Sequence, residues 1–172
     1  MMRIYLTSNN KEPLEFVRMV LSRDYNYHND IIFHYNDYGK PYLTNNDYYF
    51  NISHSGDMLA IAISNAEVGV DIELVKPRHH MDAIVGRCFI KKEKEEYDNS
   101  KDKLSYFYKH WTKMEAYTKM IGTGIKGYFN NLPDDYNLYI ETRTYKENNN
   151  VYYLSIACLD KDEKENIEVI YE

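Results

Sequence analysis

Asp71 and Glu73 place two carboxylates in a strand-like run, GVDIELV (69–75), that is otherwise apolar. Successive side chains of a strand point to opposite faces, so the two acids share one face. A third acid, Glu115, and the amine of Lys119 stand four residues apart and therefore lie on one stripe of a helix. Three carboxylates that converge repel one another unless a cation holds them. If the strand and the helix face each other, these residue types predict an all-oxygen Mg²⁺ site that takes substrate phosphates as further ligands.

Each part of this site also has an ordinary structural interpretation. Asp71 and Glu73 fit the solvent-facing side of a half-buried strand. Glu115 and Lys119 fit an exposed ion pair on a helix surface. The residue types alone leave both interpretations open.

A strand and a helix are expected at the start of the chain. Residues 3–8 (RIYLTS) are typical of a short strand, and residues 9–25 of a helix, since Pro13 is tolerated in a first helical turn. The helix is expected to present an apolar side formed by Leu14, Val17, Met19, Val20 and Leu21. These elements would begin the part of the fold that contains the acidic strand.

The residues between the first helix and the acidic pair are expected to form mainly strands. Residues 31–43 read as a strand, a turn at Gly39 and Pro41, and a second strand. Residues 48–64 read as two strands, and the second of these is continuously apolar, which indicates burial on both faces. The acidic strand would follow directly and pack against them.

The second half of the chain repeats the order of helix and strands. A short helix, a break near Phe89 and a charged helix are expected within residues 81–99. The longest helix is expected over residues 103–122 and should end at its glycines. Further strands are expected at residues 136–145, 151–159 and 167–172. The repeated order predicts two similar α+β halves with mainly antiparallel sheets.

The composition of the chain indicates a globular protein and argues against membrane and nucleic-acid partners. The 172 residues include 44% hydrophobic and 28% charged residues, which suits one compact globular unit. No apolar run approaches the roughly 20 residues that cross a bilayer, and the first residues lack the pattern of a signal peptide. We therefore expect a cytoplasmic protein without a membrane partner. The net charge of −6 argues against nucleic acid as a partner, since phosphate backbones require a basic surface. Cys88 and Cys158 stand singly, which favours packing roles.

Four motifs, in this order, resemble those of the 4′-phosphopantetheinyl transferases. They are GKPY (39–42), FNISHS (50–55), GVDIE (69–73) and WTKMEAYTKMIGTGI (111–125). The likeness is greatest to the longer type that activates peptide synthetases. The resemblance implies an enzyme that moves phosphopantetheine from coenzyme A to a serine of an apo acyl or peptidyl carrier protein and releases adenosine 3′,5′-bisphosphate.

The resemblance also implies roles for particular residues. The metal ligands for Mg²⁺ would be Asp71, Glu73 and Glu115. The expected catalytic residues are Glu115, which would accept the serine proton, Lys119, which would neutralise pyrophosphate oxygens, and His54. The expected contacts to coenzyme A are Tyr38, Gly39, Lys40 and Pro41 around the adenine, and Ser53, His54 and Lys119 at the phosphates.

Two features depart from the family pattern. The family has W-[ST]-x-K-E, whereas this chain has Met114 before Glu115 and its lysine one residue earlier, at Lys113. At about 100° per residue, Lys113 lies about 200° around the helix from Glu115, which makes it a poor substitute. The chain also lacks, between residues 8 and 13, the basic segment that longer relatives use for the 3′-phosphate.

We therefore expect two α+β halves, residues 1–75 and 76–172, related by approximate twofold symmetry. Coenzyme A and Mg²⁺ would lie in the cleft between them, and a single chain can form that cleft as a monomer. The preferred function is Mg²⁺-dependent phosphopantetheinyl transfer. The alternative is a degenerate, non-catalytic relative that binds coenzyme A or a carrier protein. Met114 and the missing basic segment support this alternative.

Overall fold

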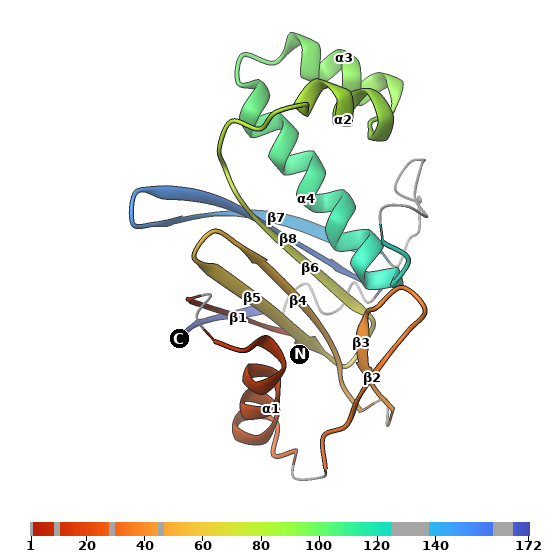
Figure 1. Cartoon of the computed structure of the whole chain (residues 1–172), viewed down its shortest axis with the longest axis vertical. Helices are drawn as coiled ribbons and strands as arrows, with labels where there is room; N and C mark the ends of the chain where they lie inside the picture. Colours follow the sequence, from red (N-terminus) through yellow and green to blue (C-terminus); the bar gives the residue numbers. More distant parts are fainter. Residues whose placement is uncertain (1, 9–10, 28–29, 45–46, 125–137, 160–166) are drawn as a thin grey trace.

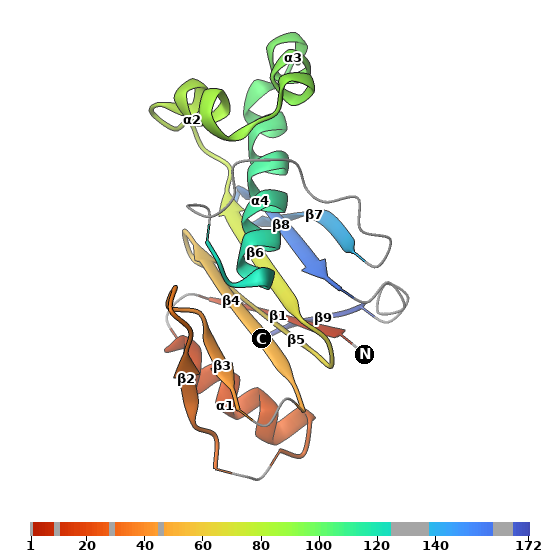
Figure 2. The ribbon, with the colours of Figure 1, turned by 90° about the vertical axis from the view of Figure 1, so that its right-hand side faces the viewer.

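The fold consists of two β-sheets that pack face to face, each covered by one helix (Figures 1 and 2). The computed structural model describes residues 2–8, 11–27, 30–44, 47–124, 138–159 and 167–172. In chain order the elements are β1 (Met2–Ser8), α1 (Pro13–Asp24), β2 (Phe33–Tyr35), β3 (Pro41–Leu43), β4 (Tyr49–Ser55), β5 (Met58–Ser64), β6 (Val68–Leu74), α2 (Met81–Cys88), α3 (Lys91–Asn99), α4 (Lys103–Ile121), β7 (Tyr139–Glu147), β8 (Asn150–Cys158) and β9 (Ile167–Tyr171).

Strand pairing confirms the predicted mixed α+β class with mainly antiparallel sheets. The first sheet has the order β4-β5-β1-β9 and the second the order β6-β8-β7, while β2 and β3 form a separate hairpin. Of these pairings, only β1 with β9 is parallel among the described residues. Each sheet combines strands from both expected halves. In the second sheet β6 pairs with β8, and in the first sheet β1 pairs with β9. The division near residue 75 and the twofold symmetry remain predictions.

Apolar side chains from both sheets fill the space between them. The alternation of side chains along β6 sends Val70 and Ile72 into this core, together with Ile4 from β1 and Leu154 from β8. All seven residues of β5 are buried, as its continuous apolar run predicts. The opposite face of β6, which carries Gly69, Asp71 and Glu73, is left for the helix that covers the second sheet.

Helix α1 covers the outer face of the first sheet through a partly different set of residues from the one expected. Val17, Val20 and Leu21 are buried, as predicted, and Phe16 joins them. Met19, expected on the apolar side, is 42% exposed. Met19 lies on the outward side of the helix, next to Arg18. Neighbouring positions of a helix differ by about 100° in direction, so consecutive apolar residues cannot all face the sheet.

Helix α4 lies across the outer face of the second sheet, as Figure 2 shows, with α2 and α3 near its N-terminal end. Buried hydroxyls fix its position: Thr112 Oγ1 lies 2.7 Å from Ser155 Oγ of β8, which in turn lies 2.8 Å from Thr142 Oγ1 of β7. Gly122 caps the helix in the left-handed conformation (φ 75°), as expected of a C-terminal glycine. No helix among the described residues has the length and apolar character needed to cross a membrane.

Gly69 allows α4 to approach β6 closely. A Cβ atom at this position would stand 1.9 Å from the backbone oxygen of Ala116 and 2.5 Å from the backbone nitrogen of Met120. Because both are backbone atoms of a packed helix, they cannot move aside independently. The absence of a side chain at Gly69 therefore sets the distance between the acidic strand and the helix that carries Glu115 and Lys119.

We expect Gly69→Ala to destabilise the fold. Overpacking typically costs about 1–3 kcal/mol, and a clash with helix backbone should lie at the upper end of that range. Gly86→Ala in α2 is the matched control, because its added Cβ meets no atom within 4 Å and alanine favours a helix. Urea unfolding of both variants measures the difference. Equal stability of the two variants would mean that α4 does not depend on the close approach.

Candidate active site

Strand β4 covers the open edge of β6 without forming a backbone ladder with it. Side-chain oxygens of alternate residues in β4 accept hydrogen bonds from backbone N–H groups of alternate residues in β6. The pairs are Val70 N to Asn51 Oδ1 (2.9 Å), Ile72 N to Ser53 Oγ (3.2 Å) and Leu74 N to Ser55 Oγ (3.0 Å). These contacts join the two sheets at the strand that carries the acidic pair.

The two serines also hold the carboxylates. Ser53 Oγ donates to Asp71 Oδ1 at 2.9 Å, and Ser55 Oγ donates to Glu73 Oε2 at 2.9 Å. Each hydroxyl therefore accepts from the β6 backbone and donates to the neighbouring acid. This arrangement fixes Asp71 and Glu73 on the face of β6 that α4 covers.

Lys119 of α4 meets this cluster at Asp71. Its Nζ lies 2.7 Å from Asp71 Oδ1 and 2.8 Å from Ser53 Oγ. The Asp71 side chain is only 6% exposed, and burial raises the pKa of its carboxyl while Lys119 opposes that rise. The interpretation of Asp71 as a solvent-facing residue is therefore wrong, and so is that of Lys119 as part of an isolated surface pair.

Glu115 lies between Lys119 and the N-terminal part of α4, and it is half-buried. Burial, together with the charge of Asp71, raises the pKa of its carboxyl to about 7, although Lys119 opposes this rise. Glu73 adds to the rise and Arg78 opposes it. The charges of Asp71 and Glu73 thus both act on the carboxyl of Glu115.

The carboxylates fit a hard divalent cation in chemistry, although they are not gathered around one point. Among the described residues, no group of three His, Cys, Asp or Glu side chains is arranged to hold a metal ion. However, Asp71 Oδ2 is buried and has no hydrogen-bond partner within the described part of the chain. A buried carboxylate oxygen without a partner is costly, and an oxygen-preferring cation would satisfy it. The donor set therefore suits Mg²⁺ better than a softer metal.

A cavity of about 220 Å³ opens beside Lys119. It is lined by the expected adenine-binding residues Tyr38, Gly39, Lys40 and Pro41, and also by residues of β4 and of the end of α4. Ser53 contacts Lys119 at its edge, whereas His54, on the next position of β4, is exposed. The structure thus brings together most of the residues expected to contact coenzyme A, and their roles remain a prediction.

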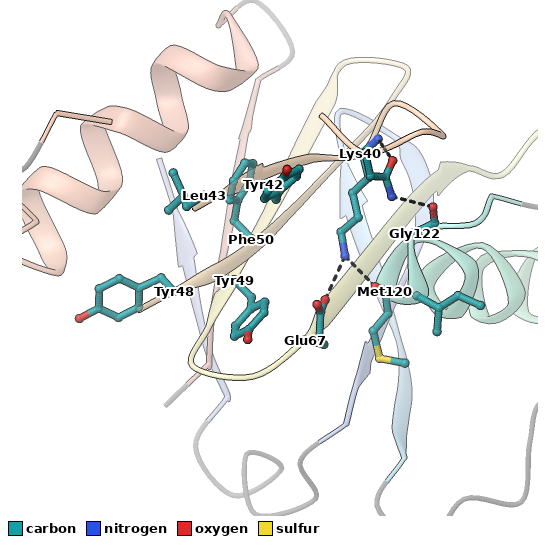
Figure 3. A pocket seen from close by; sticks show the side chains of 11 residues that line it. Lys40, Tyr42, Leu43, Tyr48, Tyr49, Phe50, Glu67, Met120 and Gly122 are labelled. Atoms are coloured by element: carbon teal, nitrogen blue, oxygen red, sulfur yellow. Dashed lines mark hydrogen bonds and ion pairs between the residues drawn. The ribbon is translucent and has the colours of Figure 1, made fainter. Parts of the chain in front are cut away.

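The amine of Lys40 contacts the end of α4. Its Nζ donates to the backbone oxygen of Met120 at 2.6 Å and lies 3.2 Å from Glu67 Oε2, as Figure 3 shows. Asn36 donates to the backbone oxygen of Gly122 at 2.9 Å, and its Oδ1 accepts from the backbone of Tyr38 and Lys40. The loop around Gly39 is thereby held against the last turn of α4.

A second cavity, of about 200 Å³, also has Lys40 in its lining (Figure 3). Tyr42, Tyr49 and Phe50 line it together with Glu67 and Met120. Burial lowers the pKa of Lys40, and Glu67 opposes this shift. Lys40 therefore forms a wall shared by both cavities.

Met114, which replaces the family lysine, is buried with 6% of its surface exposed. Lys113, the shifted lysine, is half-buried on a different side of α4. The two side chains cannot take each other's place, because successive positions of a helix differ by about 100° in direction.

Several residues of this site were not identified from the sequence. Asn51 and Ser55 alternate with Ser53 along β4, and this period-2 polar pattern is a signal that could have identified them. Arg78 lies in the segment between β6 and α2, with its Nη1 3.8 Å from Glu73 Oε1. No periodic pattern marks it, because its position depends on the course of that segment.

Comparison with known proteins agrees with this arrangement. A family model for the 4′-phosphopantetheinyl transferase superfamily matches residues 67–166, which include the acidic strand and α4. The chain belongs to this superfamily. The resemblance inferred from its motifs is therefore confirmed.

Several curated 4′-phosphopantetheinyl transferases are similar to this member of the superfamily. Gsp of Aneurinibacillus migulanus is 36% identical over 122 residues, which are 69% of this chain and 49% of the relative. Sfp of Bacillus subtilis (strain 168) is 37% identical over 116 residues, 63% of this chain and 50% of the relative. AcpT of Salmonella typhi is 35% identical over 92 residues, 51% and 48% respectively. The chain spans about half the length of these relatives.

The pKa of Glu115 predicts how the free energy of unfolding of this protein depends on pH when no metal is bound. This carboxyl titrates at about 7 when folded and near the ordinary 4.5 when unfolded, so the folded chain holds the proton more tightly. The contribution of Glu115 to the free energy of unfolding should therefore fall as the pH rises from about 4.5 to about 7. Glu115→Gln removes this titration. The change that it makes in the free energy of unfolding should therefore be more favourable above about pH 7 than below about pH 4.5.

Urea unfolding at about pH 5 and about pH 8, with a chelator present, measures this difference. Glu95→Gln, an exposed residue of α3, is the control and should show no such change between the two pH values. A Glu115→Gln effect that is the same at both pH values would contradict the raised pKa.

Proposed function

We propose that this chain transfers the 4′-phosphopantetheine group of coenzyme A to a serine of an apo acyl or peptidyl carrier protein, with Mg²⁺ as cofactor. The observation that carries the proposal is the position of Lys119, which contacts the buried Asp71 and also lines the cavity formed by the loop at Gly39. A nucleotide in that cavity would present its pyrophosphate to the carboxylates and the amine. We further propose that the chain acts as a monomer in the cytoplasm.

The reaction requires a nucleophile, a base and a stabilised leaving group. The serine oxygen of the carrier forms a bond to the β-phosphorus of coenzyme A, and the bond from that phosphorus to the oxygen bridging it to the α-phosphate breaks. Glu115 would take the serine proton, since a carboxylate beside the nucleophile can act as a general base. Adenosine 3′,5′-bisphosphate leaves with the electron pair of the broken bond.

Lys119 would act on the leaving group. Its amine bonds Asp71 in the structure and lies at the edge of the cavity, within reach of a phosphate that enters there. A positive charge at this point stabilises the negative charge that develops on the α-phosphate. Ser53, which contacts both Lys119 and Asp71, would keep the amine oriented.

Asp71, Glu73 and Glu115 would hold the Mg²⁺. Two observations support this assignment: one Asp71 oxygen has no hydrogen-bond partner among the described residues, and the charges of Asp71 and Glu73 act on Glu115. A bound ion would neutralise the pyrophosphate and draw together carboxylates that otherwise repel one another. The non-catalytic alternative gives no comparable reason for the contact between the buried Asp71 and the amine of Lys119 beside a cavity.

Carrier loading tests the proposal directly. The protein is incubated with coenzyme A, Mg²⁺ and several apo-carrier proteins, and the mass of each carrier is measured. Wild-type protein should add one phosphopantetheine group, while Asp71→Asn and Glu115→Gln should reduce loading by on the order of a hundredfold or more. Glu95→Gln is a matched control outside the site and should load normally. Near-normal loading by both site variants would refute the assignment of metal ligands and base.

Met114 should make the enzyme slow without making it inactive. The family lysine at this position would add one positive charge near the phosphates, and Met114→Lys restores it. We expect Met114→Lys to load carrier faster, on the order of tenfold, because one charge-assisted contact is worth about 1.5 kcal/mol or more. Lys113→Ala should change the rate little. A large loss with Lys113→Ala, together with no gain from Met114→Lys, would show that Lys113 is the functional lysine.

A further inference from the structure

Arg78 stands at the end of the carboxylate row opposite Lys119. Its Nη1 lies 3.8 Å from Glu73 Oε1, and its guanidinium carbon lies 5.7 Å from the centroid of the Trp111 ring. Trp111 in turn stacks on Phe107, with ring centroids 5.9 Å apart. The guanidinium is therefore placed between an acid of β6 and an aromatic face of α4.

Two cations thus flank the three acids from opposite ends. Lys119 Nζ lies 2.7 Å from Asp71 Oδ1, while Arg78 Nη1 lies 3.8 Å from Glu73 Oε1. Trp111 and Lys119 are eight residues apart on α4, which corresponds to about 12 Å along the helix axis. The two cations therefore approach the row of acids from opposite ends of this stretch of α4.

Arg78 is also available to a ligand in a way that Lys119 is not. Lys119 makes two short hydrogen bonds, whereas Arg78, among the described residues, has only the longer ion pair and the ring contact. Its side chain is 42% exposed. A guanidinium resting on an aromatic ring is already oriented, and its planar set of donors matches the oxygens of a phosphate.

We propose that Arg78 binds the phosphoryl group that is transferred, and thereby supplies the charge that is missing at Met114. The inference rests on the function proposed above. Lys119, at the end near the nucleotide cavity, serves the α-phosphate that leaves, and Arg78, at the far end, serves the β-phosphate that moves to the carrier. The two residues divide between them the charge that develops when the bond between the phosphates breaks.

Binding of two ligands separates the role of Arg78 from a general loss of charge. Calorimetry with Mg²⁺ compares coenzyme A with adenosine 3′,5′-bisphosphate, which lacks the β-phosphate. Arg78→Gln should weaken coenzyme A binding by on the order of tenfold and leave the bisphosphate almost unchanged. Lys76→Gln removes a charge from the same segment at an exposed position and is the matched control. Equal weakening of both ligands, or an effect no larger than that of Lys76→Gln, would overturn the assignment.

Carrier loading supplies the second measurement. Arg78→Gln should lower kcat/KM by on the order of ten- to a hundredfold, and Arg78→Lys should recover part of it. Met114→Lys should accelerate Arg78→Gln by a larger factor than it accelerates wild type, because both charges would serve one phosphoryl group. A rise in the carrier KM alone would instead make Arg78 a carrier contact. If wild type binds coenzyme A but loads no carrier, the proposed function fails while the calorimetry still decides the role of Arg78.

Discussion

The edge between β4 and β6 is the constraint on which the site depends. β6 is the outer strand of its sheet, and its outward N–H groups would be buried under β4 without partners if apolar side chains covered them. Asn51, Ser53 and Ser55 satisfy these groups with side-chain oxygens. In a backbone ladder the carbonyl groups of β4 would accept from these N–H groups, and the serine side chains would have no part in the junction. Because side chains form the junction, the same serines can also hold Asp71 and Glu73 in place.

This junction concentrates charge where folding alone would avoid it. Asp71 is almost fully buried, and one of its oxygens has no hydrogen-bond partner in the described part of the chain, while Glu115 keeps a raised pKa beside it. Buried charges generally stabilise a protein less than apolar side chains of the same size, so stability gives no reason for such a cluster. Groups with strongly shifted pKa values in the same place as a cavity are typical of functional sites. Packing elsewhere, especially the two apolar layers around β5, compensates for the cost.

The sequence predicted the elements well where one physical signal dominates. The continuous apolar run of β5 and the stripe of Glu115 and Lys119 both follow from periodicity. The contact between Lys119 and Asp71 confirms that the strand and the helix face each other. Periodicity does not determine which sheet a strand joins, so β9 pairing with β1 was not predictable from the pattern. Arg78 and the inward turn of Lys40 depend on the course of loops, for which the sequence carries no comparable signal.

Hydrogen bonds hold the loop at Gly39 against the end of α4. Lys40 and Asn36 bond the backbone oxygens of Met120 and Gly122, which the last turn of a helix otherwise leaves without partners. A cation at this end also interacts favourably with the helix dipole. The loop at Gly39, which lines the cavity beside Lys119, is therefore attached to the same helix that carries Lys119 and Glu115. A displacement of α4 along β6 would therefore move the wall of this cavity together with Lys119 and Glu115, so their relative positions are set by the fold.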